Sequence, residues 1–186
     1  DETLLEEARR LLRLTRRAGI PLILNDRTEV ARAVGAEGVH LGQEDLPLAA
    51  ARRLLGPNAI LGKSTHSLAQ ALAAEAEGAD YIGCGPVFAT PTKPDYAGVG
   101  LGLIAEVGSQ VRVPVVCIGG IDQATLPRTL AAGAVRVAVV ALLLGLFPSQ
   151  KTSAAKLRKV LLKEGDESVR AGVLLALGLF GKGGAA

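Results

Sequence analysis

Aromatic residues are scarce in this chain, and this shortage restricts what kind of core and surface it can build. Only 3% of the 186 residues are aromatic, whereas 49% are hydrophobic and most of those are Ala, Leu and Val. A core of small aliphatic side chains suits helices that pack tightly on a parallel sheet. The net charge is only +3, and no basic stripe is interleaved with aromatic residues. We therefore interpret the Arg-Arg pairs as solvated helix faces and expect no nucleic-acid partner.

Cysteines and long apolar runs are also rare. Cys84 and Cys117 are the two cysteines, and both lie inside apolar runs. They are too few for a disulfide framework or a zinc site, so we expect reduced, packed thiols in a cytoplasmic protein. No run reaches the roughly 18 apolar residues that a membrane-spanning helix needs, and the apolar segment 137–147 is too short. We therefore expect no membrane segment.

Short apolar runs alternate with helical stretches along the chain. The expected strands cover residues 22–24, 38–41, 59–61, 81–84, 113–118 and 136–140. The expected helices cover residues 2–18, 28–35, 47–55, 67–77, 101–109, 123–132 and 151–163. A Gly-Ala step at Gly35, Gly78 and Gly133 is typical of a helix that ends in a left-handed cap before the next strand. The pattern predicts six βα units and a parallel sheet.

Polar residues gather at the carboxyl ends of almost all expected strands, where α/β barrels build their sites. This favours a (β/α)8 TIM-type barrel, and a doubly wound open sheet is the alternative. A full barrel takes about 250 residues, so we expect residues 1–164 to form a partial barrel that lacks its first strands. Residues 165–186 are expected to form a partly disordered tail in which 173–177 is a helix or a strand. Unpaired strand edges would favour a homo-oligomer.

Two acidic residues follow neighbouring strands. Asp26 comes directly after Asn25 at the end of one buried strand, and Asp45 follows the next strand. Each could be a helix N-cap. Two carboxylates at the tips of adjacent parallel strands could also reach one point, and oxygen ligands of this kind suit Mg²⁺ when water and phosphate complete its shell. The coincidence favours a metal-assisted phosphate site.

The segment Gly62 to Ser67 has the composition of a phosphate-binding P-loop but not its spacing. Five residues separate Gly56 from Gly62, and a strand lies among them, so the P-loop interpretation fails. Ser64, at a strand end, could still donate its hydroxyl to a ligand. His66 is either part of a helix cap or a proton carrier.

A long Pro-containing loop follows the fourth expected strand and contains Thr90, Thr92 and Lys93. Long βα loops in barrels act as lids, and Lys93 suits a departing phosphate, although it could be a solvated loop lysine. Gly119-Gly120 and residues 139–141 follow the last two strands. Barrels often bind a phosphate there through backbone amides, with ordinary turns as the alternative.

Five ordered motifs together resemble the thiamine-phosphate synthase family and its thiazole tautomerase relatives. They are Leu-Ile-Leu-Asn-Asp-Arg (22–27), Gly-Val-His-Leu-Gly-Gln-Glu-Asp (38–45), Lys-Ser-Thr-His-Ser (63–67), Gly-Pro-Val-Phe-Ala-Thr-Pro-Thr-Lys-Pro (85–94) and Ile-Gly-Gly-Ile (118–121). The resemblance runs from about residue 3 to residue 141, and the Thr-Pro-Thr-Lys loop resembles the synthase rather than the tautomerase.

The resemblance implies a barrel transferase of thiamine biosynthesis that acts on small molecules. It would join hydroxymethylpyrimidine diphosphate to thiazole phosphate, with Mg²⁺ assisting the release of diphosphate. The implied metal ligands are Asp26 and Asp45, and the implied diphosphate ligands are Asn25 and Lys93. Ser64 would contact the pyrimidine. The residues implied for the thiazole phosphate are Thr90, Thr92, Gly120 and the amides near Val140 and Ala141. We count Lys93, Ser64 and His66 as candidate catalytic residues.

Two departures from the family leave alternatives open. The family has an earlier strand that ends in a Gln, Arg and Lys cluster, which does not occur before Asp1, and Ala141 stands where the family normally has Ser. One alternative is a metal-independent thiazole phosphate tautomerase with His66 as its acid or base. The other is a non-catalytic phosphate-binding paralogue.

Overall fold

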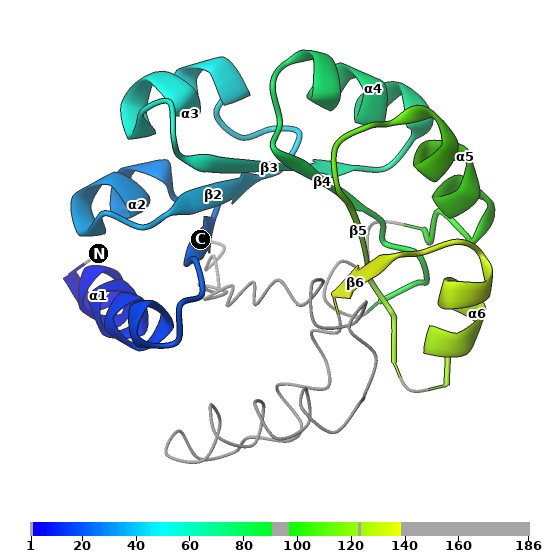
Figure 1. Cartoon of the computed structure of the whole chain (residues 1–186), viewed down its shortest axis with the longest axis horizontal. Helices are drawn as coiled ribbons and strands as arrows, with labels where there is room; N and C mark the ends of the chain where they lie inside the picture. Colours follow the sequence, from blue (N-terminus) through cyan, green and yellow to red (C-terminus); the bar gives the residue numbers. More distant parts are fainter. Residues whose placement is uncertain (1, 91–96, 123, 139–186) are drawn as a thin grey trace, which may run out of the picture. The chain divides into compact units, whose positions relative to one another are not determined.

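The computed structural model describes residues 2–90, 97–122 and 124–138 (Figure 1). Its helices are α1 (Glu2–Arg17), α2 (Thr28–Val34), α3 (Leu48–Leu55), α4 (Leu68–Ala76), α5 (Gly102–Gln110) and α6 (Leu126–Ala131). Its strands are β1 (Ile23–Asn25), β2 (Gly38–Leu41), β3 (Ile60–Thr65), β4 (Tyr81–Cys84), β5 (Val115–Ile118) and β6 (Arg136–Ala138). Thr92, Lys93, Val140, Ala141, the expected helix 151–163 and the expected tail lie outside the described residues.

The strands follow one another in the sheet in the order of the chain, β1-β2-β3-β4-β5-β6. β1 pairs in parallel with β2, β4 with β5, and β5 with β6. A doubly wound sheet would reverse its strand order part-way, whereas a barrel adds each strand beside the last. The unreversed order therefore confirms the barrel-type winding that the sequence favours.

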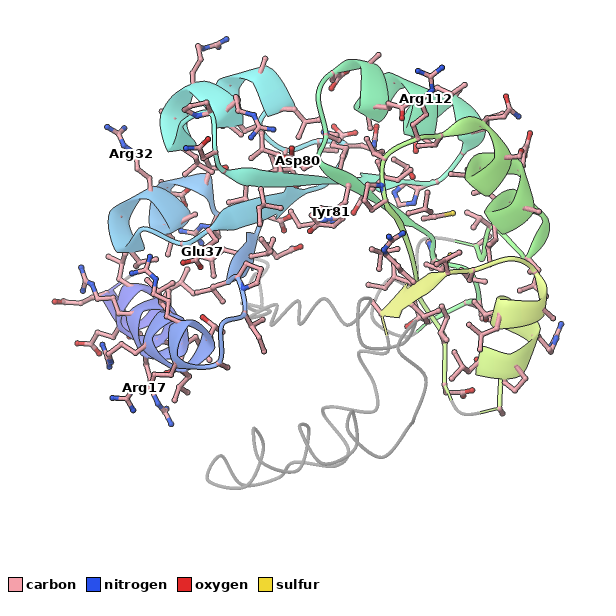
Figure 2. The ribbon with its side chains drawn as sticks, in the orientation of Figure 1. Arg17, Arg32, Glu37, Asp80, Tyr81 and Arg112 are labelled. Atoms are coloured by element: carbon pink, nitrogen blue, oxygen red, sulfur yellow. The ribbon has the colours of Figure 1, made fainter. Side chains whose placement is uncertain are left out.

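The described residues divide into two compact units, with the boundary between Gly62 and Lys63 inside β3. In the first unit α1 packs on α2, α2 packs on α3, and α2 also covers β1. Arg17 and Arg32 project from α1 and α2 away from the strands and are exposed, as expected of solvated helix faces (Figure 2). The core of this unit consists of Ala8, Leu12, Leu22, Ile23, Leu24, Val30, Ala31, Val39, Leu41, Leu48, Ala51 and Leu61.

In the second unit α4 packs on α5 and β4, and α5 packs on β5. Figure 1 shows α4, α5 and α6 on one side of β4, β5 and β6. A core cluster of this unit consists of Val87, Ile104, Cys117, Ile121 and Ala134. None of the helices in the described part of the chain is long and apolar enough to cross a membrane.

The expected elements within the described residues are all found, with shifts of up to four residues at their ends. The expected strand 59–61 begins one residue later and continues to Thr65, because Thr65 keeps bonding to the neighbouring strand: its Oγ1 donates to the Gly83 carbonyl over 2.9 Å. Ser67 is the N-cap of α4 and its Oγ accepts the Gln70 N–H. His66 therefore precedes the helix rather than beginning it.

Candidate functional site

Asp26 has an unusual backbone at the end of β1. Its φ is 61°, and it is the one residue other than glycine with a positive φ among those the structure describes. Its N–H donates to the His40 carbonyl over 2.8 Å, so β2 holds this conformation in place. The N-cap of α2 is Arg27, which makes no side-chain cap bond. Strain of this kind costs about 1–3 kcal/mol and clusters at functional sites.

Asp45 closes the turn that follows β2. Its Oδ2 accepts the Gly42 N–H over 2.6 Å. A side chain at Gly42 would bring Cβ to 3.0 Å from the same oxygen, so the turn favours glycine there. α3 begins after Pro47 without a side-chain cap, so Asp45 is not a helix cap. Because β1 and β2 run parallel, both acids follow the carboxyl ends of neighbouring strands in the first unit.

Asp26 and Asp45 suit a metal ion that takes its other ligands from water and from a substrate. In the described part of the chain no group of three or more His, Cys, Asp or Glu residues is placed to hold a metal ion. A closed site made only of protein ligands is therefore not found there. Mg²⁺ binds through one or two carboxylates and takes its other ligands from water and substrate phosphate. Asp26 and Asp45, with one oxygen of Asp45 already bonded to an amide, fit this second kind of site.

In the second unit the ends of β3 and β4 are joined by hydrogen bonds. The Thr65 carbonyl accepts the Gly85 N–H over 3.1 Å, and the Nδ1–H of His66 donates to the Gly85 carbonyl. Because a carbonyl oxygen only accepts, this contact places a proton on Nδ1. Ser64 is half-buried at position five of the six-residue strand β3, so it is close to the strand end, as predicted.

The loops after β4 and β5 are bonded to each other. The Val87 N–H donates to the Ile118 carbonyl over 2.8 Å, and the Phe88 N–H donates to the Gly119 carbonyl over 3.0 Å. Gly120 has φ 63°, and a Cβ added there would lie 2.7 Å from the Phe88 Cβ. Gly120 is thus required both by its backbone and by the loop beside it. Thr90 follows in the same loop and is half-buried.

Known proteins match the part of the chain that contains the residues described above. Residues 1–143 match the sequence model of a family described as thiamine monophosphate synthase. The chain belongs to that family. It is 54% identical over 138 residues to a thiamine-phosphate synthase from Chloroflexus aurantiacus, a match that covers 74% of this chain and 63% of the relative. It is 46% identical over 164 residues to a thiamine-phosphate synthase from a Roseiflexus species, with 87% of this chain and 69% of the relative covered.

A solved structure supports the same assignment. Thiamine phosphate pyrophosphorylase from Pyrococcus furiosus superposes with a TM-score of 0.74 at 36% identity, over 87% of this chain and 77% of that one. The chain spans less than two thirds of several of the synthases it matches, for example 44% of a relative from Gloeobacter violaceus. The resemblance that the five motifs predict is confirmed at the level of the family.

One pair of residues in this synthase-family chain was missed by the sequence analysis. Asp122 Oδ1 accepts the backbone N–H groups of Ala124 and Thr125, each over 2.9 Å. Thr125 Oγ1 lies 2.9 Å from the same Oδ1 and 3.2 Å from the Gly120 carbonyl. Hydrogen bonds from the Thr125 N–H and, with a smaller effect, from the Thr125 hydroxyl hold the pKa of Asp122 below its ordinary value. The Asp-x-x-Thr spacing before a helix could have predicted this pair.

The predicted site residues of this family member thus fall into two separate groups. Asn25, Asp26 and Asp45 follow β1 and β2 in the first unit. In the second unit Ser64 and His66 lie at the end of β3, Thr90 lies in the loop after β4, and Gly120 lies in the loop after β5. The roles of all these residues stay predictions.

Proposed function

We propose that this chain acts as a thiamine-phosphate synthase, which joins a hydroxymethylpyrimidine diphosphate to a thiazole phosphate and releases diphosphate. The observation that carries the proposal is the strained Asp26 at the end of β1, with φ 61°, in a chain whose relatives bear the synthase name. The backbone strain at Asp26, together with relatives that bear the synthase name, supports a functional requirement for this carboxylate.

The two carboxylates would be the protein ligands of Mg²⁺. Asp26 and Asp45 both follow carboxyl ends of parallel strands, and Asp45 is oriented by the Gly42 N–H over 2.6 Å. When bound, Mg²⁺ would neutralise charge that develops on the departing diphosphate. Asn25, beside Asp26, would donate its amide N–H groups to the same diphosphate.

Apart from that of His66, the remaining roles are those that the family resemblance implies, and the chemistry of each side chain agrees with them. Ser64 would contact the pyrimidine through its hydroxyl. Lys93 would carry a positive charge to the diphosphate. His66, whose Nδ1–H is held by the Gly85 carbonyl, would keep the β3 and β4 ends in register. The groups proposed to take the thiazole phosphate are Thr90, Thr92, Gly120 and the amides at Val140 and Ala141.

The difficult step in this reaction is charge separation. The bond between the exocyclic methylene carbon and the diphosphate oxygen breaks, and positive charge remains on the pyrimidine-bearing carbon. The thiazole nitrogen then forms the new bond to that carbon. Lys93 and the Asn25 amide stabilise the leaving anion without forming a covalent intermediate, because donors aimed at developing charge lower the barrier.

The test is a comparison of Asp26→Gly with Asp26→Ala. Glycine adopts a positive φ without strain, so Asp26→Gly should leave the free energy of unfolding within about 1 kcal/mol of the parent. Diphosphate release with both substrates and Mg²⁺ should nevertheless fall by about 100-fold or more in both variants. Glu29→Ala is the matched control, because Glu29 is an exposed acid of the adjacent helix, paired with Arg27.

Unchanged diphosphate release in Asp26→Gly would refute the role of the carboxylate. The tautomerase alternative makes a different prediction, namely metal-independent isomerisation that is lost in His66→Ala. The relatives carry the synthase name, and the hydrogen bond of His66 to Gly85 supports a positioning role for this residue. We further propose that the enzyme works in the cytoplasm, because both cysteines are free.

A further inference from the structure

The two cysteines of the chain lie opposite each other on neighbouring strands. Cys84 ends β4 and is aligned with Cys117 of β5 in the parallel register. Both are free thiols and both are buried, with 0% and 1% of their surface exposed. The proposed reaction uses no thiol. The presence of two facing cysteines is therefore explained either by packing alone or by another role.

The spacing of the strands brings the two residues within range of a disulfide. Neighbouring strands lie about 4.8 Å apart, and aligned residues of a parallel pair place their side chains on the same face. Disulfides form at Cα separations of about 4.4–6.8 Å. The Cβ atoms of such a pair run alongside each other rather than converging, so the disulfide would be strained and therefore easily reduced.

The two sulfurs also interact in the reduced state. A hydrogen bond from the Cys117 thiol lowers the pKa of Cys84 below its ordinary value, and the same bond raises the pKa of Cys117. Cys84 is thus the partner that more readily gives up its proton, and Cys117 is the one that keeps it. Thiol–disulfide exchange proceeds by attack of a thiolate on a disulfide sulfur, so a lowered thiol pKa favours it.

A groove approaches Cys117 from outside. A cavity of about 480 Å³ lies between α5 and the connection from α6 to β6, and Cys117 is among its lining residues, with Ile104 and Ala134 beside it. Arg112 is another lining residue of the same groove, and its positive charge suits an anionic reagent. A small opening of this groove would expose the Cys117 sulfur.

We propose that Cys84 and Cys117 form a reversible disulfide with a low-molecular-weight disulfide as the oxidant. The Cys117 sulfur attacks one sulfur of the oxidant while its proton passes to the departing sulfur, and the first small thiol leaves. The Cys84 sulfur then attacks Cys117 and releases its proton, and the second small thiolate leaves. Together the two thiols lose two electrons and two protons, and the oxidant becomes two thiols.

The disulfide would act on the loops that follow both strands. Cys84 directly precedes Gly85, and Cys117 directly precedes Ile118, whose carbonyl accepts the Val87 N–H over 2.8 Å. A change in the β4–β5 spacing would therefore displace the loops that contain Thr90 and Gly120. The formation of the disulfide is independent of the proposed function, whereas its effect on thiazole phosphate binding depends on that function.

The experiment incubates the folded full chain with oxidised glutathione, blocks the remaining thiols with iodoacetamide and measures the intact mass. The expected product has lost two hydrogens, carries no iodoacetamide adduct and regains both thiols with dithiothreitol. Cys84→Ser and Cys117→Ser should not form it, and Cys84→Ala and Cys117→Ala serve in their place if a serine variant fails to fold. Two alkylated cysteines, or a stable glutathione adduct on Cys117, would overturn the proposal.

The effect on function is measured separately with the same oxidised and reduced samples. The KM for the thiazole phosphate should rise about tenfold on oxidation, which corresponds to about 1.4 kcal/mol of lost binding. The KM for the pyrimidine diphosphate should change less. If the disulfide forms but neither KM changes, the modification site stands and its effect on the loops is wrong. If the reduced chain has no activity, the proposed function fails while the disulfide result remains.

Discussion

Replacement of Glu37 should destabilise the first unit more than its half-exposed position suggests. Glu37 precedes β2 (Figure 2), and its Oε2 accepts the Leu22 N–H over 2.9 Å. Its Oε1 accepts the Arg16 Nε–H over 2.9 Å, and Arg16 also donates to the Gly35 carbonyl over 2.8 Å. One carboxylate therefore joins the end of α1 and the start of β1 to the turn before β2.

The magnitude follows from the two contacts. Leu22 is 1% exposed, so in Glu37→Ala its N–H loses a charged acceptor in a place that water reaches poorly, at a cost of about 1.5–3 kcal/mol. The ion pair with Arg16 is half-exposed and adds about 0.2–1 kcal/mol. We expect Glu37→Ala to lower the free energy of unfolding by about 2–3 kcal/mol. Arg16→Ala should cost only about 1 kcal/mol.

Urea denaturation monitored by circular dichroism measures these differences. Glu29→Ala is the matched control, since Glu29 pairs with an arginine but accepts no backbone N–H in β1, and its cost should stay below about 0.5 kcal/mol. Equal losses for the three variants would refute the reasoning, because they would show that the Leu22 N–H gains nothing from Glu37. If Glu37→Ala lowers the free energy of unfolding only as much as Arg16→Ala does, the contribution of Glu37 comes from the ion pair alone.

The pH dependence of stability gives a second measurement of the same contact. Burial alone would raise the pKa of Glu37, but the bonds from the Leu22 N–H and Arg16 outweigh it and hold the pKa below its ordinary value of 4.5. The stabilisation is therefore fully present above about pH 4.5 and is lost as the pH falls through the lower, folded-state value. In Glu37→Gln this part of the acid destabilisation should be absent when urea midpoints are compared between pH 7 and pH 3.

Two further substitutions test the loops and the caps. Gly120→Ala should cost at least about 2 kcal/mol in urea denaturation, because a Cβ at φ 63° would meet the 88–89 backbone at 2.9 Å; Gly102→Ala, where nothing lies near the added Cβ, should be neutral or stabilising. Ser67→Ala should cost about 1 kcal/mol by the same assay, since it removes the N-cap bond to Gln70, and a loss below about 0.3 kcal/mol would contradict that role.

The alternation of elements could be predicted from the sequence because it depends on local properties. Apolar runs without polar alternation predict strands covered on both faces, and Gly35 ends α2 in the left-handed conformation, with φ 74°, as its place after a helical pattern indicates. The length of β3 could not be predicted in this way. Thr65 belongs to the strand because it bonds to Gly83 and Gly85, which lie about twenty residues further along the chain.

In the candidate site, too, some features could be predicted from local sequence and others depend on tertiary contacts. The sequence predicted that both acids follow the carboxyl ends of neighbouring strands, where barrels place polar groups. The left-handed backbone of Asp26 depends on the His40 carbonyl of the next strand, and the turn closed by Asp45 depends on the Gly42 N–H. Both are tertiary or turn contacts that no periodicity reveals, and the second removes the helix-cap alternative for Asp45.

The loops after β4 and β5 should respond as one body to any change in either. Val87 and Phe88 donate to the carbonyls of Ile118 and Gly119, and the Val99 N–H donates back to the Pro86 carbonyl over 2.8 Å. Because the bonds of Val87 and Phe88 cross from one loop to the other, a displacement of Gly120 should move the segment that leads to Thr90. Groups proposed to take one phosphate are therefore coupled by backbone hydrogen bonds, so a substitution in one loop should weaken binding through the other as well.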